Sequence, residues 1–295
     1  MTRPDRRQDS AKRKGTVMTS DEAPGADDGA SKVGPLPFDV TKAHQARTYD
    51  YLLGGKDNYA ADRASADEAI KIYPDVVFTM RANRAFLGRA VRYLAGEAGI
   101  RQFLDLGTGI PTAGNLHEVA QAIAPDSRVV YVDYDPVVLA HARALLDSSE
   151  AGATEYIDAD LRDTGTILSR AADLLDFTKP VAITLMSILH AIPEADDPYS
   201  IVAMLLDTVP SGSYLAISQF GEELMPAEAR EALLASARRT SLQQYTARTR
   251  EQVARFFDGT DLVEPGLVRV EEWRQDPGAR GEGKSVYWCA VGRKR

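Results

Sequence analysis

Between about residues 100 and 220, apolar residues form short runs that are separated by amphipathic stretches. Runs of this kind are typical of buried parallel strands, which have apolar side chains on both faces. The predicted strands are 102–106, 128–133, 154–158, 181–186 and 213–218. The predicted helices between them are 113–123, 136–147, 164–175 and 198–209. This alternation predicts βαβ units, and therefore an α/β fold whose parallel sheet is covered by helices.

The last third of the chain has a different pattern. Helices are expected at about 227–239 and 250–257, and two β-rich runs follow at 267–273 and 285–291. The segment between the two runs is rich in glycine and has no helical periodicity. Two strands joined without a helix should be antiparallel. We therefore expect the parallel sheet to finish with an antiparallel hairpin.

The N-terminal part divides into two regions. Residues 1–34 are rich in Ser, Asp, Gly and Ala and have almost no large apolar side chains, so a disordered tail is predicted. Residues 35–97 carry three helical patterns, the first of which ends at the glycine pair Gly54-Gly55. We interpret 35–97 as a helical lid region and 98–295 as the main domain.

Composition narrows the class of protein. The formal net charge is −8, which disfavours nucleic acid as a partner because its phosphates are repelled. The single cysteine, Cys289, excludes a disulfide framework or a thiolate metal cluster. No apolar run approaches the roughly 20 residues that span a bilayer, and no apolar segment follows the basic N-terminus as in a secretory signal. A cytoplasmic protein is expected.

A glycine turn after the first predicted strand is the first candidate site. Asp105 ends the apolar run, and Gly107 and Gly109 then permit a tight turn with close approach of backbone to a ligand. Thr112 stands where a dinucleotide motif has its third glycine, which allows approach around a pyrophosphate. The absence of this third glycine favours a cofactor that has no pyrophosphate. S-adenosyl-L-methionine fits, and Asp105 would orient its ammonium group.

Acidic residues follow the next two strands. Asp133 ends the second strand, where a carboxylate is placed to accept both hydroxyls of an adenosine ribose. Asp135 has two equal interpretations, a helix cap or a ligand contact. Asp160 is an acceptor for an adenine amino group, and Leu161 would pack on the ring. These positions extend the predicted cofactor site across three strands.

Ser187 and His190 follow the fourth strand, whose carboxyl end should face the ligand crevice. His190 is a candidate general base, and the alternative is a structural wall. His44 and His141 are interpreted as helix-surface residues. No spacing of His, Asp and Glu in the sequence resembles a metal site.

The run 47–59 combines charged groups with three tyrosines. Tyrosine faces stabilise cations, and a sulfonium is one. We therefore interpret this run as a lid over cofactor and substrate, with Tyr49 and Asn58 as cofactor contacts. Tyr59 is a second candidate for removing a proton from a hydroxyl acceptor. The alternative is a capped amphipathic helix followed by a turn.

Four of these segments together resemble a known family: RTYDYLLGGKDNYAADR, FLDLGTGIPT, VVYVDYDPVVLAHARALL and ADLRD. They are similar to the actinobacterial S-adenosyl-L-methionine-dependent methyltransferases once catalogued as domain of unknown function 574, within the class I methyltransferases. The resemblance covers roughly residues 37–293. It implies a Rossmann-like, seven-stranded, mostly parallel sheet with an antiparallel last strand. It also implies that Asp105, Gly107 and Gly109 hold the methionine part, Asp133 the ribose, and Asp160 with Leu161 the adenine.

The methyl acceptor is less clearly indicated. The Asn-Pro-Pro-Tyr signature of methyltransferases that act on nucleic-acid amino groups is missing, since Met186–Leu189 stands in its place. This favours a small-molecule acceptor. Two other functions remain open at this stage. A non-catalytic binding or regulatory protein on the same scaffold is the main alternative, and a nicotinamide dehydrogenase is disfavoured by the missing third glycine. Nothing in the sequence indicates an oligomeric state.

Overall fold

The computed structural model describes residues 38–112, 114–145, 152–240, 245–276, 278 and 283–295. They belong to one compact unit, Pro37–Arg295. The predicted tail, 1–34, lies outside the described residues. No helix within these ranges is long and apolar enough to cross a membrane.

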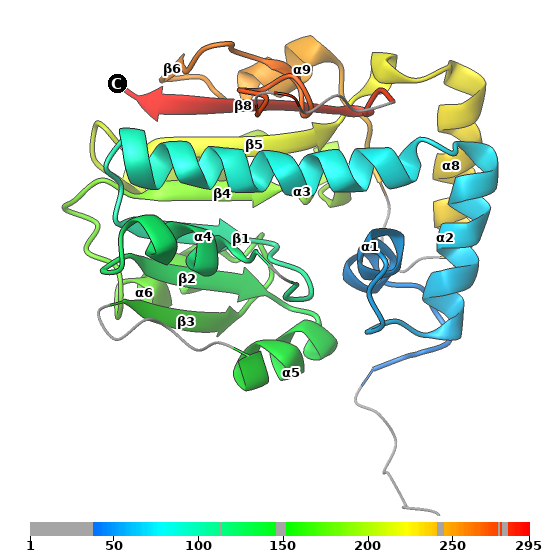
Figure 1. Cartoon of the computed structure of the whole chain (residues 1–295), viewed down its shortest axis with the longest axis horizontal. Helices are drawn as coiled ribbons and strands as arrows, with labels where there is room; N and C mark the ends of the chain where they lie inside the picture. The colour runs from blue at the N-terminus through cyan, green and yellow to red at the C-terminus, as the bar shows by residue number, and fades with distance from the viewer. Residues whose placement is uncertain (1–37, 113, 146–151, 241–244, 277, 279–282) are drawn as a thin grey trace, which may run out of the picture. The chain divides into compact units, whose positions relative to one another are not determined.

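An eight-stranded sheet forms the centre of the unit, in the order β3-β2-β1-β4-β5-β8-β6, with β7 paired to β8 beside this path. The strands are β1 Gln102–Leu106, β2 Arg128–Asp133, β3 Ala153–Asp158, β4 Ala182–Met186, β5 Tyr214–Phe220, β6 Thr260–Leu262, β7 Val268–Arg269 and β8 Tyr287–Lys294. Strands β1 to β5 are parallel to one another, whereas β8 is antiparallel to β5, β6 and β7 (Figure 1). The predicted α/β fold with an antiparallel ending is confirmed.

The helices cover both faces of the sheet. They are α1 Gln45–Leu53, α2 Ala60–Ile72, α3 Val76–Arg92, α4 Leu116–Ile123, α5 Pro136–Leu145, α6 Thr164–Ala171, α7 Pro198–Thr208, α8 Ala227–Thr240 and α9 Arg250–Arg255. Successive strand residues point to opposite faces, so Phe103 packs in a core with α3 and α4. Leu104 packs in a second core with α6 and α7. The sheet is therefore buried on both sides, which explains the continuous apolar runs.

The predicted strand 267–273 is largely wrong. Of this run only Val268 and Arg269, which form β7, pair with β8, and the chain then turns. The buried side chains are Leu267, Val270 and Trp273, three residues apart, and this spacing suits a turn rather than the two-residue period of a strand. The short strand β6 was not predicted, since only Thr260 of its three residues is buried.

Helix α1 lies beyond the carboxyl ends of the parallel strands (Figure 1). It begins after the N-cap residue His44, which has extended backbone angles. It ends at Gly54, which has the left-handed φ of 89° that glycine adopts without steric cost. This placement brings α1 against the edge of the sheet where open parallel sheets bind ligands.

Candidate active site

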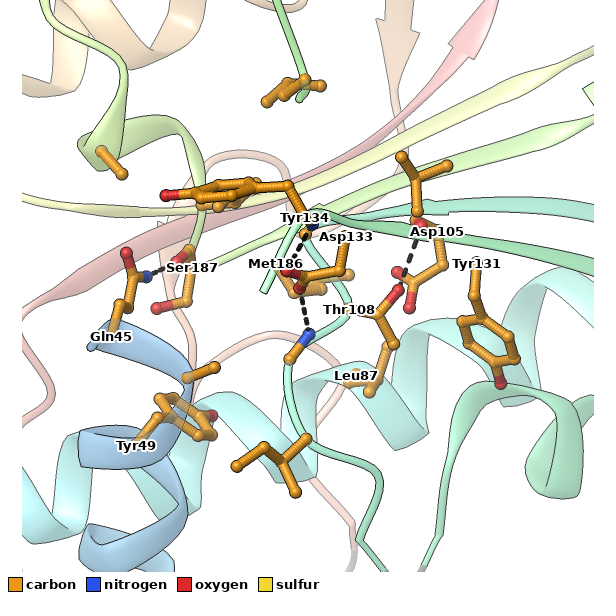
Figure 2. Close-up of a pocket in the computed structure, with 18 of the residues that line it drawn as sticks. Gln45, Tyr49, Leu87, Asp105, Thr108, Tyr131, Asp133, Tyr134, Met186 and Ser187 are labelled. Carbon is orange, nitrogen blue, oxygen red and sulfur yellow. Dashed lines mark hydrogen bonds between the residues drawn. The ribbon is translucent and has the colours of Figure 1, made fainter. Parts of the chain in front are cut away.

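A cavity opens at the carboxyl ends of β1, β2 and β4, between the sheet and helices α1 and α3. We call it the first cavity. Its lining includes eight of the predicted site residues: Tyr49, Asp105, Gly107, Gly109, Asp133, Asp160, Leu161 and Ser187. Figure 2 shows Tyr49 and Gln45 reaching it from α1, opposite Asp105 and Tyr131. The structure thus brings together residues that are separated by more than a hundred positions in the sequence.

The turn after β1 requires glycine for two reasons. Gly107 has a φ of 72° and Gly109 a φ of 69°, in the left-handed region. A Cβ on Gly107 would lie 2.4 Å from the Ile188 side chain. The loop therefore passes directly against the segment after β4, and this contact closes one wall of the first cavity.

Asp133 organises the centre of the first cavity. One carboxylate oxygen accepts the backbone N–H of Gly109 at 2.8 Å, and the other accepts those of Tyr134 and Asp135 at 2.8 and 3.0 Å (Figure 2). Burial raises the pKa of this carboxyl above its ordinary value. A carboxylate has about four acceptor sites. The three N–H groups leave about one of these sites for a ligand.

Asp105 is a buried carboxyl on the floor of the cavity. Burial raises its pKa to about 6, although the Thr184 hydroxyl, which donates to it at 2.5 Å, opposes this shift. The Thr108 hydroxyl donates to the Asp105 backbone carbonyl at 3.2 Å and tightens the turn (Figure 2). A buried carboxyl with a raised pKa gains most from a cationic partner, so this position suits a ligand ammonium group.

Asp160 lies at the rim of the first cavity and is held by its neighbour. The Arg162 guanidinium donates to both carboxylate oxygens, at 2.9 and 2.6 Å, and these bonds lower the pKa of Asp160. Leu161 between them is buried. The predicted adenine contacts are thus adjacent, and Arg162 orients the acid.

Helix α3 contributes two residues that sequence reasoning missed. Asn83 is buried and its amide nitrogen donates to the Tyr49 hydroxyl at 3.0 Å, while its Oδ1 has no hydrogen-bond partner among the described residues. Arg84 donates to Asn115 Oδ1 at 3.1 Å, and both Asn83 and Arg84 line the first cavity. The sequence did contain a signal for Asn83, because a polar residue on the same helix face as Met80, Leu87 and other apolar residues is expected to be buried.

Asn58 and Tyr59 do not line the cavity. Asn58 donates from its side-chain nitrogen to Asp50 at 2.9 Å and so ties the loop after α1 back to that helix. Tyr59 caps α2, and its ring lies 5.6 Å from the Arg47 guanidinium. Both residues stabilise the α1–α2 connection, and this position does not support the cofactor or catalytic roles expected for them.

His44 is not a surface residue, contrary to the sequence interpretation. Its Nδ1 lies 2.6 Å from Asp135 Oδ2, and both side chains are buried. Asp135 also accepts the backbone N–H of Val137 at 2.9 Å, as expected for a cap of α5. A contact between residues so far apart in the chain leaves no local pattern that sequence analysis could detect.

A second cavity adjoins the first. Gln45, Tyr49 and Ser187 line both. Its other walls come mainly from α1, α2, α3, α8 and β8 and are largely apolar or aromatic, with Leu52, Met80, Phe220, Leu233, Tyr245 and Tyr287 among them. The predicted catalytic residue His190 lines this second cavity rather than the first.

Ser187 stands at the boundary between the two cavities. It has a φ of 58°, a strained conformation for a residue with a side chain. Its hydroxyl lies 3.0 Å from the Tyr287 hydroxyl, and its backbone N–H donates to Ser218 Oγ at 2.9 Å. Such strain is maintained where the surrounding structure requires it, which is common at functional sites.

Comparison with known proteins identifies the family. The family model described as S-adenosyl methyltransferase matches residues 32–295. The chain belongs to this family of methyltransferases. The methyltransferase therefore uses S-adenosyl-L-methionine as its methyl donor, which confirms the cofactor predicted from the glycine turn. No curated protein matches its sequence.

Two solved structures are similar to this methyltransferase over most of its length. One is a DUF574 family protein from Streptomyces avermitilis, 45% identical with a TM-score of 0.82, where the match covers 86% of this chain and 98% of that protein. The other is a putative methyltransferase from Thermobifida fusca, 42% identical with a TM-score of 0.79, covering 86% and 96%. The predicted resemblance to the former domain of unknown function 574 is confirmed.

Proposed function

We propose that the methyltransferase binds S-adenosyl-L-methionine in the first cavity and methylates a small molecule held in the second. The observation that supports this arrangement is the shared wall. Gln45, Tyr49 and Ser187 line both cavities, so ligands in the two would meet there. Direct methyl transfer needs the two reactants side by side with their reacting atoms aligned.

The polar groups of the first cavity suit the amino-acid part of this cofactor. Asn83 Oδ1 is a buried acceptor without a partner among the described residues, and Asp105 is a second buried acceptor. Both would accept from the ammonium group. Arg84 follows Asn83 on α3 and lines the same cavity, and it would pair with the carboxylate. The buried Asn83 Oδ1 thereby gains a hydrogen-bond donor, and the Asp105 carboxyl gains a cationic partner.

The rest of the first cavity suits the adenosine. Asp133 has about one acceptor site left for a ribose hydroxyl. Asp160 and Leu161 would hold the adenine, as a hydrogen-bond acceptor and as an apolar contact. Tyr134 follows Asp133 directly, and its partly exposed ring lies across the cavity, where it adds an aromatic surface (Figure 2).

When bound, the cofactor supplies a methyl group activated by its attachment to a cationic sulfur. The protein's residues then have three tasks. Asp133 and the Gly107 turn fix the position of the adenosine, Asn83 and Tyr49 orient the groups near the shared wall, and α1 shields that wall from water. Positioning of this kind supplies much of the acceleration when the electrophile is already activated.

A methyl-transfer experiment on a cell extract tests the proposal. The protein is incubated with extract and cofactor labelled in the methyl group, and the products are separated by mass. The expected result is label in the low-mass fraction. Label in protein or nucleic acid would overturn the small-molecule acceptor. Retained cofactor binding with no label in any fraction would instead favour the non-catalytic binding protein.

A further inference from the structure

The tautomer of His190 follows from a hydrogen-bonded chain at the shared wall. The side-chain amide nitrogen of Gln45 contacts both the Ser187 carbonyl oxygen and His190 Nε2, the latter at 3.0 Å (Figure 2 shows the Gln45–Ser187 contact). A carbonyl oxygen only accepts, so the Gln45 atom must be the donating nitrogen. His190 Nε2 therefore accepts its second N–H. A neutral imidazole in this arrangement carries its proton on Nδ1.

His190 stays neutral over the physiological pH range. Burial lowers its pKa to about 3, and the positive charge of Arg248 adds to the shift. With Nε2 occupied by Gln45 and Nδ1 protonated, the ring has no free lone pair in its plane. The geometry thus favours a hydrogen-bond donor over the general base suggested by the sequence.

The Nδ1–H group of His190 lacks an acceptor. The atom is buried and has no hydrogen-bond partner among the described residues, and His190 is the only residue on the second cavity's lining with such an atom. A buried donor without a partner costs free energy that a ligand acceptor would recover. Because the His190 side chain lines the second cavity, a ligand bound there is placed to supply the missing acceptor.

The second cavity also lacks formal charge. Its lining contains no Asp, Glu, Lys or Arg within the part of the chain that the structure describes, and its histidine is neutral. Moving a charged group from water into such surroundings without a counter-ion is strongly unfavourable. Aromatic rings border His190 on two sides, with the centroids of Tyr245 and Tyr287 at 5.3 and 5.7 Å. These surroundings favour flat, uncharged ligands.

We propose that the second cavity selects an uncharged aromatic methyl acceptor whose hydrogen-bond-accepting atom pairs with the Nδ1–H of His190. This inference rests on the proposed function, because it takes the second cavity as the acceptor site. It assigns His190 to substrate orientation and excludes anionic and cationic acceptors.

Three bicyclic probes separate the features of this proposal. Quinoline is uncharged and has a ring-nitrogen acceptor, naphthalene has the same shape without it, and quinoline-4-carboxylate adds a negative charge. Binding is measured by ligand-observed NMR titration in the presence of S-adenosylhomocysteine. We expect quinoline to bind at least about tenfold more tightly than its carboxylate. The ratio of quinoline to naphthalene affinity should fall about fivefold in His190→Phe, which keeps the ring but loses the donor.

Two further variants serve as controls. His141→Phe makes the same change on α5, outside the lining of both cavities, and should leave the ratio unchanged. Leu234→Trp fills the second cavity from α8 and should abolish probe binding without affecting S-adenosylhomocysteine. Equal binding of quinoline and its carboxylate, an unchanged ratio in folded His190→Phe, or no binding of any probe would overturn the inference. Calorimetry on the same samples separates the two claims, because loss of S-adenosylhomocysteine binding in the wild type would overturn the proposed function itself.

Discussion

His44 and Asp135 form a buried pair, Nδ1 to Oδ2 at 2.6 Å, that joins the start of α1 to the loop after β2. Asp133, which lies two residues before Asp135, accepts three backbone N–H groups in the same loop. The pair therefore connects the helix that covers the cofactor cavity to the residue at the centre of that cavity. Burial alone raises the pKa of Asp135, but the hydrogen bond and charge of His44 outweigh this and leave it below its ordinary value.

Substitution of His44 tests this connection. In His44→Ala, Asp135 stays buried without its partner, and such losses cost about 3 kcal/mol of unfolding free energy. Because α1 then docks less firmly, S-adenosylhomocysteine should also bind at least about tenfold more weakly. Denaturant unfolding and calorimetry measure the two effects. His141→Ala, whose ring is only partly buried and lies 3.6 Å from Asp57, should change neither. Wild-type stability in His44→Ala would refute the role given to the pair.

Asp105 gives the protein a predictable pH dependence. Its pKa is about 6 in the folded state and near the ordinary 3.8 after unfolding, so the folded state binds more protons between these values. Stability contributed by this group is therefore lost as the pH rises through that window. Asp105→Asn removes the effect and keeps an acceptor for the Thr184 hydroxyl.

The expected difference is measured by denaturant unfolding at several pH values. Relative to the wild type, Asp105→Asn should gain about 3 kcal/mol of stability between pH 4 and pH 7. Asp158→Asn, an exposed acid at the end of β3, serves as the matched control and should show no such gain. A constant difference between wild type and Asp105→Asn across this range would show that the pKa of Asp105 is not raised.

The left-handed backbone of Ser187 predicts that a glycine at this position is more stable than an alanine, the reverse of the order expected at an ordinary backbone conformation. Ser187→Gly and Ser187→Ala both lose the hydroxyl contact to Tyr287, so they differ mainly in backbone strain. At a φ of 58° glycine has no steric penalty, whereas alanine pays about 1 kcal/mol or more. Ser187→Gly should therefore be the more stable variant in thermal or denaturant unfolding. If Ser187→Ala is equal or better, the strain at this position is absent.

Most of the site residues that were predictable from the sequence lie at or just after strand ends, and Tyr49 on α1 is the exception. Asp105, Gly107 and Asp133 follow apolar runs directly, and the carboxyl ends of parallel strands meet at one edge of the sheet. The apolar runs in the sequence are therefore enough to predict that these three residues lie close together. The same reasoning brought Ser187 to the cavity edge, although it could not reveal its positive φ.

The helical contributions were harder to predict because they depend on tertiary packing. Gln45 contacts His190 only because α1 docks across the sheet edge, and no local spacing encodes that contact. Tyrosines near a charged run suggested a lid, but only Tyr49 reaches a cavity, whereas Tyr59 packs beside Arg47. The predicted strand at 267–273 failed for a related reason, since burial around Val270 follows the turn rather than strand alternation.

Calorimetric titration with S-adenosylhomocysteine tests the central claim most directly, namely that the first cavity holds the cofactor around Asp133. The samples are wild type, Asp133→Ala and Asp158→Ala. Asp158 is the matched control, because it pairs in register with Asp133 on the neighbouring strand β3 but is exposed and does not line the cavity. Circular dichroism confirms that each is folded. We predict binding at one site in the wild type and in Asp158→Ala, and affinity lowered more than about tenfold in Asp133→Ala. Equal affinity in all three folded proteins, or none in the wild type, would contradict the account.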